Sequence, residues 1–83
     1  MGAWIEKKMK DLVEYIAQGL VENPNEVAVE EVTSGDGTRV IELRLAEDDR
    51  GKVIGKKGRT AHAIRTLLHA ISVDRPVSLD ILD

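Results

Sequence analysis

The chain has 83 residues, 42% of them apolar and 33% charged, with a net charge of −3. The high charge and the lack of any apolar run of about 20 residues exclude a membrane-embedded chain. With no cysteine, disulfides and thiolate metal sites are excluded. We therefore expect one domain over residues 1–83, in the cytoplasm, without a signal peptide, membrane contact or cofactor.

The first predicted element is a helix from about Trp4 to Val21, because apolar residues recur there at helical spacing. Asn23-Pro24-Asn25 ends this helix. The expected apolar stripe consists of Ile5, Met9, Leu12, Val13, Ile16 and Leu20.

Two strands are expected next, joined by a hairpin loop over Ser34–Thr38 whose glycines supply positive φ angles. The first strand begins with Val27 and Val29. Val32 falls out of phase with them, which leaves a bulge or a twist open. In the second strand, two sets alternate: Ile41, Leu43 and Leu45 against Val40, Glu42 and Arg44.

In the second half of the chain, Asp48 or Asp49 is expected to cap a short helix through about Ile54. The loop Gly55–Gly58 separates it from a longer helix between about Arg59 and Ser72, and a last strand follows Pro76. The order α-β-β-α-α-β predicts a two-layer α+β domain, with a three-stranded sheet covered on one face by helices.

The loop Gly55-Lys56-Lys57-Gly58 combines several features that suit a phosphate group. Glycine permits a sharp turn or a close approach to a ligand, and the helix that follows offers free N–H groups to an anion. The spacing fits neither a Walker loop nor the dinucleotide fingerprint. By itself, however, such a loop is more often a tight turn between two helices with solvated lysines.

Charge along the chain fits an anion site and a solvated helix face equally well. Residues 50–73 contain six basic and no acidic residues. The rest of the chain contains six basic and fifteen acidic residues, a net charge of −9. A focused basic patch on an acidic body still attracts phosphate locally, because salt screens distant charges.

Val53-Ile54-Gly55-Lys56-Lys57-Gly58 resembles the V-I-G-x-x-G signature of KH domains, whose loop clamps an RNA backbone. The element order resembles the type II form of that fold. The stretches 49–59 and 63–68, with Asn23-Pro24, resemble the small bacterial single-KH family KhpA.

The resemblance implies a cytoplasmic binder of single-stranded RNA with weak sequence preference, an RNA chaperone linked to cell elongation and division. It also implies a homodimer or a heterodimer with a Jag-type KH protein. An adaptor that acts mainly through such protein contacts stays open as the alternative. An enzyme is not expected, because no catalytic set of residues is spaced recognisably.

By the same resemblance, the two loop glycines admit the RNA backbone and the two loop lysines face its phosphates. Neighbouring basic residues widen the positive surface. Of Val53 and Ile54, one anchors the short helix and the other lines a groove for the nucleobases, with Ile54 favoured for the groove. The expected RNA-binding residues are Gly55, Lys56, Lys57, Gly58, Lys52, Arg59, Ile54, Arg50 and Arg65.

The long helix also predicts a partner surface. Its core stripe is expected to be Ala61, Ile64, Leu68 and Ile71. The adjoining flank of Ala63, Leu67 and Ala70 then widens the apolar arc beyond what one core contact requires. Whether Leu67 contacts a partner or packs at the core edge stays open.

The remaining charged candidates receive surface roles. His62 and His69 lie two turns apart, about 10 Å along the helix, which is too far for one metal without further ligands. Arg39 and Arg44, on or beside the second strand, are interpreted as solvated strand charges, with contact to RNA as the alternative.

Overall fold

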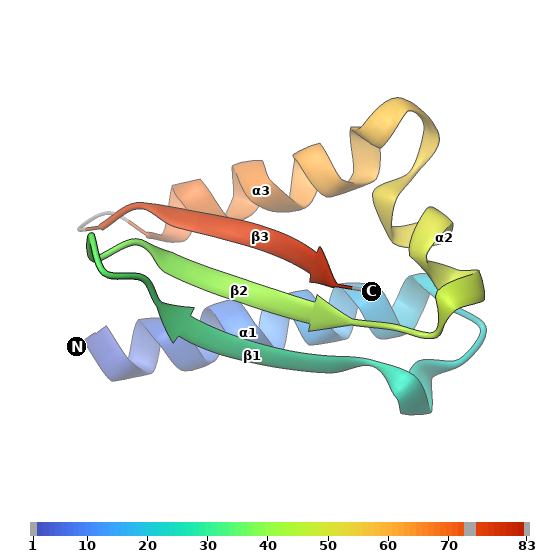
Figure 1. The fold of residues 1–83 in the computed structure, drawn as a ribbon, viewed down its shortest axis with the longest axis horizontal. Coiled ribbons are helices and arrows are strands. Elements are labelled where there is room, and N and C mark those ends of the chain that lie inside the picture. The colour runs from blue at the N-terminus through green and yellow to red at the C-terminus, as the bar shows by residue number, and fades with distance from the viewer. Residues whose placement is uncertain (1, 73–74, 83) are drawn as a thin grey trace.

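The computed structural model describes residues 2–72 and 75–82, with side chains from residue 7 onward (Figure 1). The elements are, in chain order, α1 (Gly2–Leu20), the 3-10 turn η1 (Pro24–Glu26), β1 (Ala28–Thr33), β2 (Arg39–Arg44), the turn η2 (Glu47–Asp49), α2 (Arg50–Ile54), the turn η3 (Lys56–Gly58), α3 (Arg59–Ile71) and β3 (Val77–Leu82). The predicted order of helices and strands is confirmed.

The three strands form one mixed sheet with β2 in the centre. β1 runs antiparallel to β2, and β3 runs parallel to it. Figure 1 shows α1 and α3 side by side on one face of the sheet, with α2 at one end. The fold is therefore the predicted α+β arrangement, compatible with a type II KH domain.

The pairing of β1 with β2 advances one residue at a time, from Ala28 opposite Arg44 to Thr33 opposite Arg39, without a bulge. Val32 lies on the open face of the sheet and is 40% exposed. The phase change in the sequence therefore reflects an apolar residue on the outer face.

The core lies between the helices and the covered face of the sheet. It comprises Met9, Val13, Ala17, Ile41, Leu43, Val53, Ala61, Ile64, Leu68, Val77 and Leu79. The stripe predicted for α1 is correct at Met9 and Val13, but Leu20 at its end is 41% exposed and the buried Ala17 was missed. Ile5 lies outside the described side chains.

The prediction that Arg39 is a solvated strand charge is wrong, because its side chain is fully buried. It begins β2 in phase with the inward-facing Ile41 and Leu43, so the alternation of the strand turns it toward the core. Arg44, on the other phase, is exposed as expected.

The hairpin loop closes through hydrogen bonds from Ser34 N–H to the Thr38 carbonyl (2.9 Å) and from Gly37 N–H to the Ser34 carbonyl (3.0 Å). Of its two glycines, only Gly37 has a positive φ, +89°. The Asp36 carboxylate accepts hydrogen bonds from the Ser34 hydroxyl and the Thr38 N–H. These contacts, the Ser34 bond foremost, lower the pKa of Asp36 from 3.8 to about 2.

Candidate nucleic-acid interface

The glycine loop begins where α2 ends. Gly55 donates its N–H to the Gly51 carbonyl at 2.9 Å, which closes the last turn of α2. It then adopts φ +79° and ψ 172°, a region open essentially only to glycine. Gly58 N–H bonds back to the Gly55 carbonyl at 3.1 Å, so the loop is a single tight turn.

The two glycines are needed for different reasons. A Cβ on Gly55 would overlap the Thr60 hydroxyl and lie 2.7 Å from Thr60 Cβ and 2.9 Å from Thr60 N. A Cβ on Gly58 would meet nothing within 4 Å, and the constraint there is φ, +75°. Lys57 also has a left-handed backbone, with φ +57° and ψ 26°, and strain of this kind gathers at functional sites.

The loop opens onto the first turn of α3. Arg59 N–H bonds to the Lys56 carbonyl, and no side chain caps the helix at Gly58. Lys56, Lys57 and Arg59 are exposed, and across residues 2–72 and 75–82 none of them forms an ion pair. Three exposed cations, two on the turn and one on the first residue of α3, thus surround a helix start that favours anions.

The other predicted cations are engaged in contacts within the protein. Lys52 Nζ lies 3.3 Å from Asp49 Oδ1 and 3.6 Å from Glu22 Oε2. The hydrogen bond to Asp49 and the charge of Glu22 outweigh partial burial and raise the pKa of Lys52. The basic segment therefore has acidic neighbours in space that the residue count along the chain missed.

The two arginines at the margins of the segment are held in a similar way. The Arg50 guanidinium lies 3.7 Å from Glu47 Oε1. Arg65 donates a hydrogen bond to the Leu79 carbonyl of β3 at 3.3 Å. The free positive charge is thus more concentrated at the loop than the sequence indicated.

Asp49 does not cap α2 as predicted. It occupies the cap position, but its carboxylate accepts no capping hydrogen bond from a backbone N–H of α2, and its one bond to that helix comes from the Lys52 ammonium. It is 1% exposed and accepts hydrogen bonds from Glu22 and Asn23 instead. Burial would raise the pKa of Asp49, but bonds from Asn23, Glu22 and Lys52 outweigh it and lower the pKa.

The apolar pair before the loop divides as the sequence indicated. Val53 is fully buried, whereas Ile54 is 40% exposed beside the loop. Val53 therefore anchors α2, and Ile54 is left exposed at the surface.

The long helix α3 also divides as predicted. Ala61, Ile64 and Leu68 are buried, and Ile71 is half-buried. The flank of Ala63, Leu67 and Ala70 is exposed, with Leu67 at 46%.

The two histidines of α3 differ in their surroundings. His62 is exposed, and His69 Nε2 lies 3.0 Å from the Val77 carbonyl. Among the described residues, no group of three or more His, Cys, Asp and Glu is placed to hold a metal ion.

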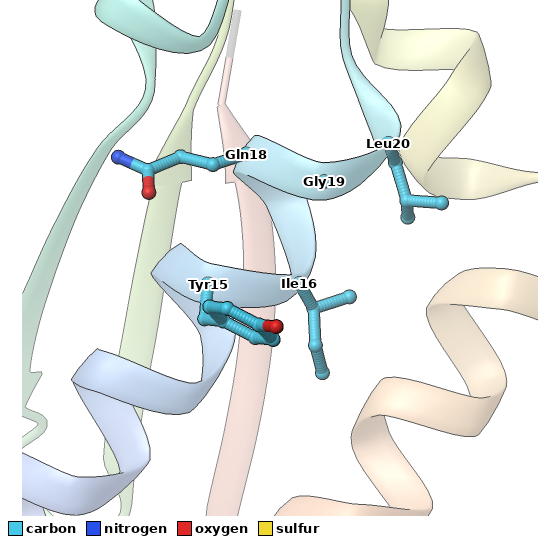
Figure 2. A pocket seen from close by; sticks show the side chains of 5 residues that line it. All are labelled: Tyr15, Ile16, Gln18, Gly19 and Leu20. Atoms are coloured by element: carbon cyan, nitrogen blue, oxygen red, sulfur yellow. The ribbon is translucent and has the colours of Figure 1, made fainter.

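The last turns of α1 form a hollow of about 450 Å³. No residue of the glycine loop lines it. It is lined by Tyr15, Ile16, Gln18, Gly19 and Leu20, none of them charged (Figure 2). Figure 2 shows Ile16 and Leu20 pointing toward the neighbouring helices. None of the described helices is long and apolar enough to cross a membrane.

Comparison with known proteins agrees with this geometry. The family model described as "KhpA/KhpB, KH domain" matches residues 10–81. The chain is 54% identical over 65 residues to RNA-binding protein KhpA of Clostridium acetobutylicum, covering 78% of this chain and 85% of that protein. It is 49% identical over 77 residues to RNA-binding protein KhpA of Halalkalibacterium halodurans, covering 90% and 100%. The chain therefore belongs to the KhpA/KhpB family of KH domains.

Proposed function

We propose that this protein binds single-stranded RNA in the cytoplasm, holding the RNA backbone at Gly55–Gly58 without catalysing a reaction. One observation carries the proposal: the glycine turn presents Lys56, Lys57 and Arg59, none of them ion-paired among the described residues, at the start of α3. The names of the relatives, each an RNA-binding protein, support it.

The proposed RNA-binding residues differ in how freely each side chain can reach the RNA. Gly55, Gly58 and the three cations of the turn form its centre, with Ile54 against a base. Lys52, Arg50 and Arg65 would have to leave contacts within the protein, so they contribute less.

Sequence preference is expected to be weak. The only aromatic residues, Trp4 and Tyr15, both belong to α1, so the loop has no aromatic platform on which bases stack. A binder of this kind fits the role of an RNA chaperone, and the link to cell elongation and division rests on the family resemblance alone.

A pair of charge-reversal variants tests the proposal. Lys56→Asp/Lys57→Asp reverses the charge at the loop, and Lys7→Glu/Lys8→Glu makes the same change in net charge in the first half of α1, at the opposite end of the molecule (Figure 1). We expect the loop variant to lose binding in a fluorescence assay, while the α1 variant keeps affinity near that of wild type. Equal losses in both would show that only net charge matters, and unchanged binding of the loop variant would contradict the site.

Self-association through α3, or pairing with a Jag-type KH protein, is a second proposed function. The observation that favours it is Leu67, 46% exposed between the small Ala63 and Ala70. The neighbouring helix α1 adds the 76% exposed Tyr15 and the 41% exposed Leu20. A second helix can approach small residues closely, and exposed apolar patches often mark interfaces.

Leu67→Glu tests the second function by sedimentation together with circular dichroism. Val32→Glu is the matched control, because Val32 is 40% exposed on the open face of the sheet. A wild-type dimer that becomes a folded monomer only with Leu67→Glu supports the interface. A wild type that is monomeric at high micromolar concentration contradicts the homodimer.

A further inference from the structure

Asp49 joins the start of α2 to the chain that leaves α1. Its buried carboxylate accepts hydrogen bonds from Glu22 N–H at 3.2 Å, from Asn23 N–H at 3.0 Å and from Asn23 Nδ2 at 2.9 Å. The Lys52 ammonium is a fourth donor at 3.3 Å. One side chain thus connects segments 26 and 27 positions apart in sequence.

The residues of α2 alone do not determine how this helix is oriented. It has five residues, and Val53 is the one that is buried. A helix this short is not stable by itself, so its orientation depends on tertiary contacts. Those contacts include the packing of Val53, the bonds of Asp49 just before the first turn and the ion pair of Lys52 with Glu22.

The orientation of α2 passes directly to the glycine loop. Gly55 is bonded to Gly51 within α2, and it packs so closely on the first turn of α3 that an added Cβ would lie 2.9 Å from Thr60 N. A shift of α2 therefore moves Gly55 relative to the start of α3 and changes the turn that carries Lys56 and Lys57.

We infer that Asp49, with Asn23 as its counterpart, is a positioning residue for the RNA site: it acts by fixing α2, and with it the loop, against the end of α1. This inference rests on the proposed function. Asp49 itself does not touch RNA, because it is buried.

Three variants test the inference on the full chain. Asn23→Ala removes one of the four donors to the carboxylate. Asp49→Asn replaces an acceptor oxygen with an amide nitrogen that cannot accept a hydrogen bond. Val77→Ala is the control, because it trims a core residue where β3 begins, at the end of the sheet away from α2 (Figure 1).

Each variant is studied at a temperature at which circular dichroism shows it fully folded. Two quantities are measured: the backbone amide resonances of residues 55–60 without RNA, and the affinity for a fluorescent single-stranded RNA at several salt concentrations. The first readout needs no RNA, so it separates the positioning role from the proposed function.

We expect Asn23→Ala and Asp49→Asn to shift the loop amides and to weaken RNA binding by about tenfold, the scale of one lost charged hydrogen bond. Their salt dependence should become shallower by about 0.7 per lost phosphate contact. Val77→Ala should leave the loop amides and the salt dependence unchanged. If Asp49→Asn does not fold, Asn23→Ala decides the matter.

Two results would overturn the inference. Loop amides and affinity of Asn23→Ala that match those of Val77→Ala would show that Asp49 only adds stability. Shifted loop amides with RNA affinity unchanged, together with unchanged binding by Lys56→Asp/Lys57→Asp, would place the failure in the RNA site itself.

Discussion

Replacing Gly55 with alanine probes the feature on which the loop depends, its backbone shape. In the folded protein the new methyl group would overlap Thr60, including its backbone nitrogen at 2.9 Å. Because backbone is involved, the clash cannot be relieved by a side-chain rotation, and the first turn of α3 has to move.

The magnitude follows from two contributions. A non-glycine residue in this backbone region costs about 1–3 kcal/mol, and overpacking that shifts backbone costs about another 1–3 kcal/mol. An 83-residue domain has a free energy of unfolding of about 4–12 kcal/mol, so Gly55→Ala removes a large share. A loss of only about 2 kcal/mol would lower Tm by about 8–16 °C.

Two other glycines supply the controls. Gly58→Ala meets no atom and changes only φ preference, so it should cost about 1–2 kcal/mol. Gly51, inside α2, has open space and no positive φ, and Gly51→Ala should stabilise by about 0.5–1 kcal/mol. Thermal and urea unfolding of the three variants gives the order directly. If Gly55→Ala is within about 0.5 kcal/mol of Gly58→Ala, the steric reasoning is wrong.

Three further predictions concern salt, the core and acid. With three or four phosphate contacts, raising salt from about 50 to 200 mM should weaken RNA binding about 20- to 50-fold, and a flat response in the same titration would contradict backbone binding at the loop. Leu68→Ala should cost about 2–5 kcal/mol because Leu68 is 1% exposed, whereas Leu67→Ala should cost about 1 kcal/mol or less; equal losses in urea unfolding would contradict the division of α3. The pKa of Asp36 (about 2) and that of Asp49 both lie below the ordinary aspartate value of 3.8, so the folded state binds fewer protons than the unfolded chain. The free energy of unfolding should therefore fall as pH drops from about 4 toward 2, and unfolding midpoints that stay constant over this range would argue against these contacts.

The fold could be predicted from the sequence where local patterns and tertiary structure agree. Helical spacing in α1 and α3 and alternation in β2 and β3 located the elements, because one face of each is buried. Arg39 shows where the pattern is insufficient. From sequence, a charged side chain at the end of a strand is expected to be solvated. Burial of Arg39 is indicated only when the alternation of β2 is extended by one residue, from Val40 to Arg39, which puts Arg39 in phase with Ile41.

The site could be predicted from the sequence at the glycine loop, but the contacts around the loop could not. Glycine spacing and the lysines indicated the turn directly. The contacts of Lys52 and Asp49 were not predictable, because their partners Glu22 and Asn23 lie more than 25 positions away and meet them only after folding. A local cap is the usual role of an aspartate before a helix, and here a tertiary contact replaces it.

The most direct test of RNA binding at the glycine loop is a titration of the isotope-labelled protein with a single-stranded RNA, followed by the backbone amide resonances. We predict that the largest shifts fall on Gly55–Thr60, with smaller ones at Ile54. Shifts that are largest on the open face of the sheet, or absent at the loop while RNA is bound, would contradict the account.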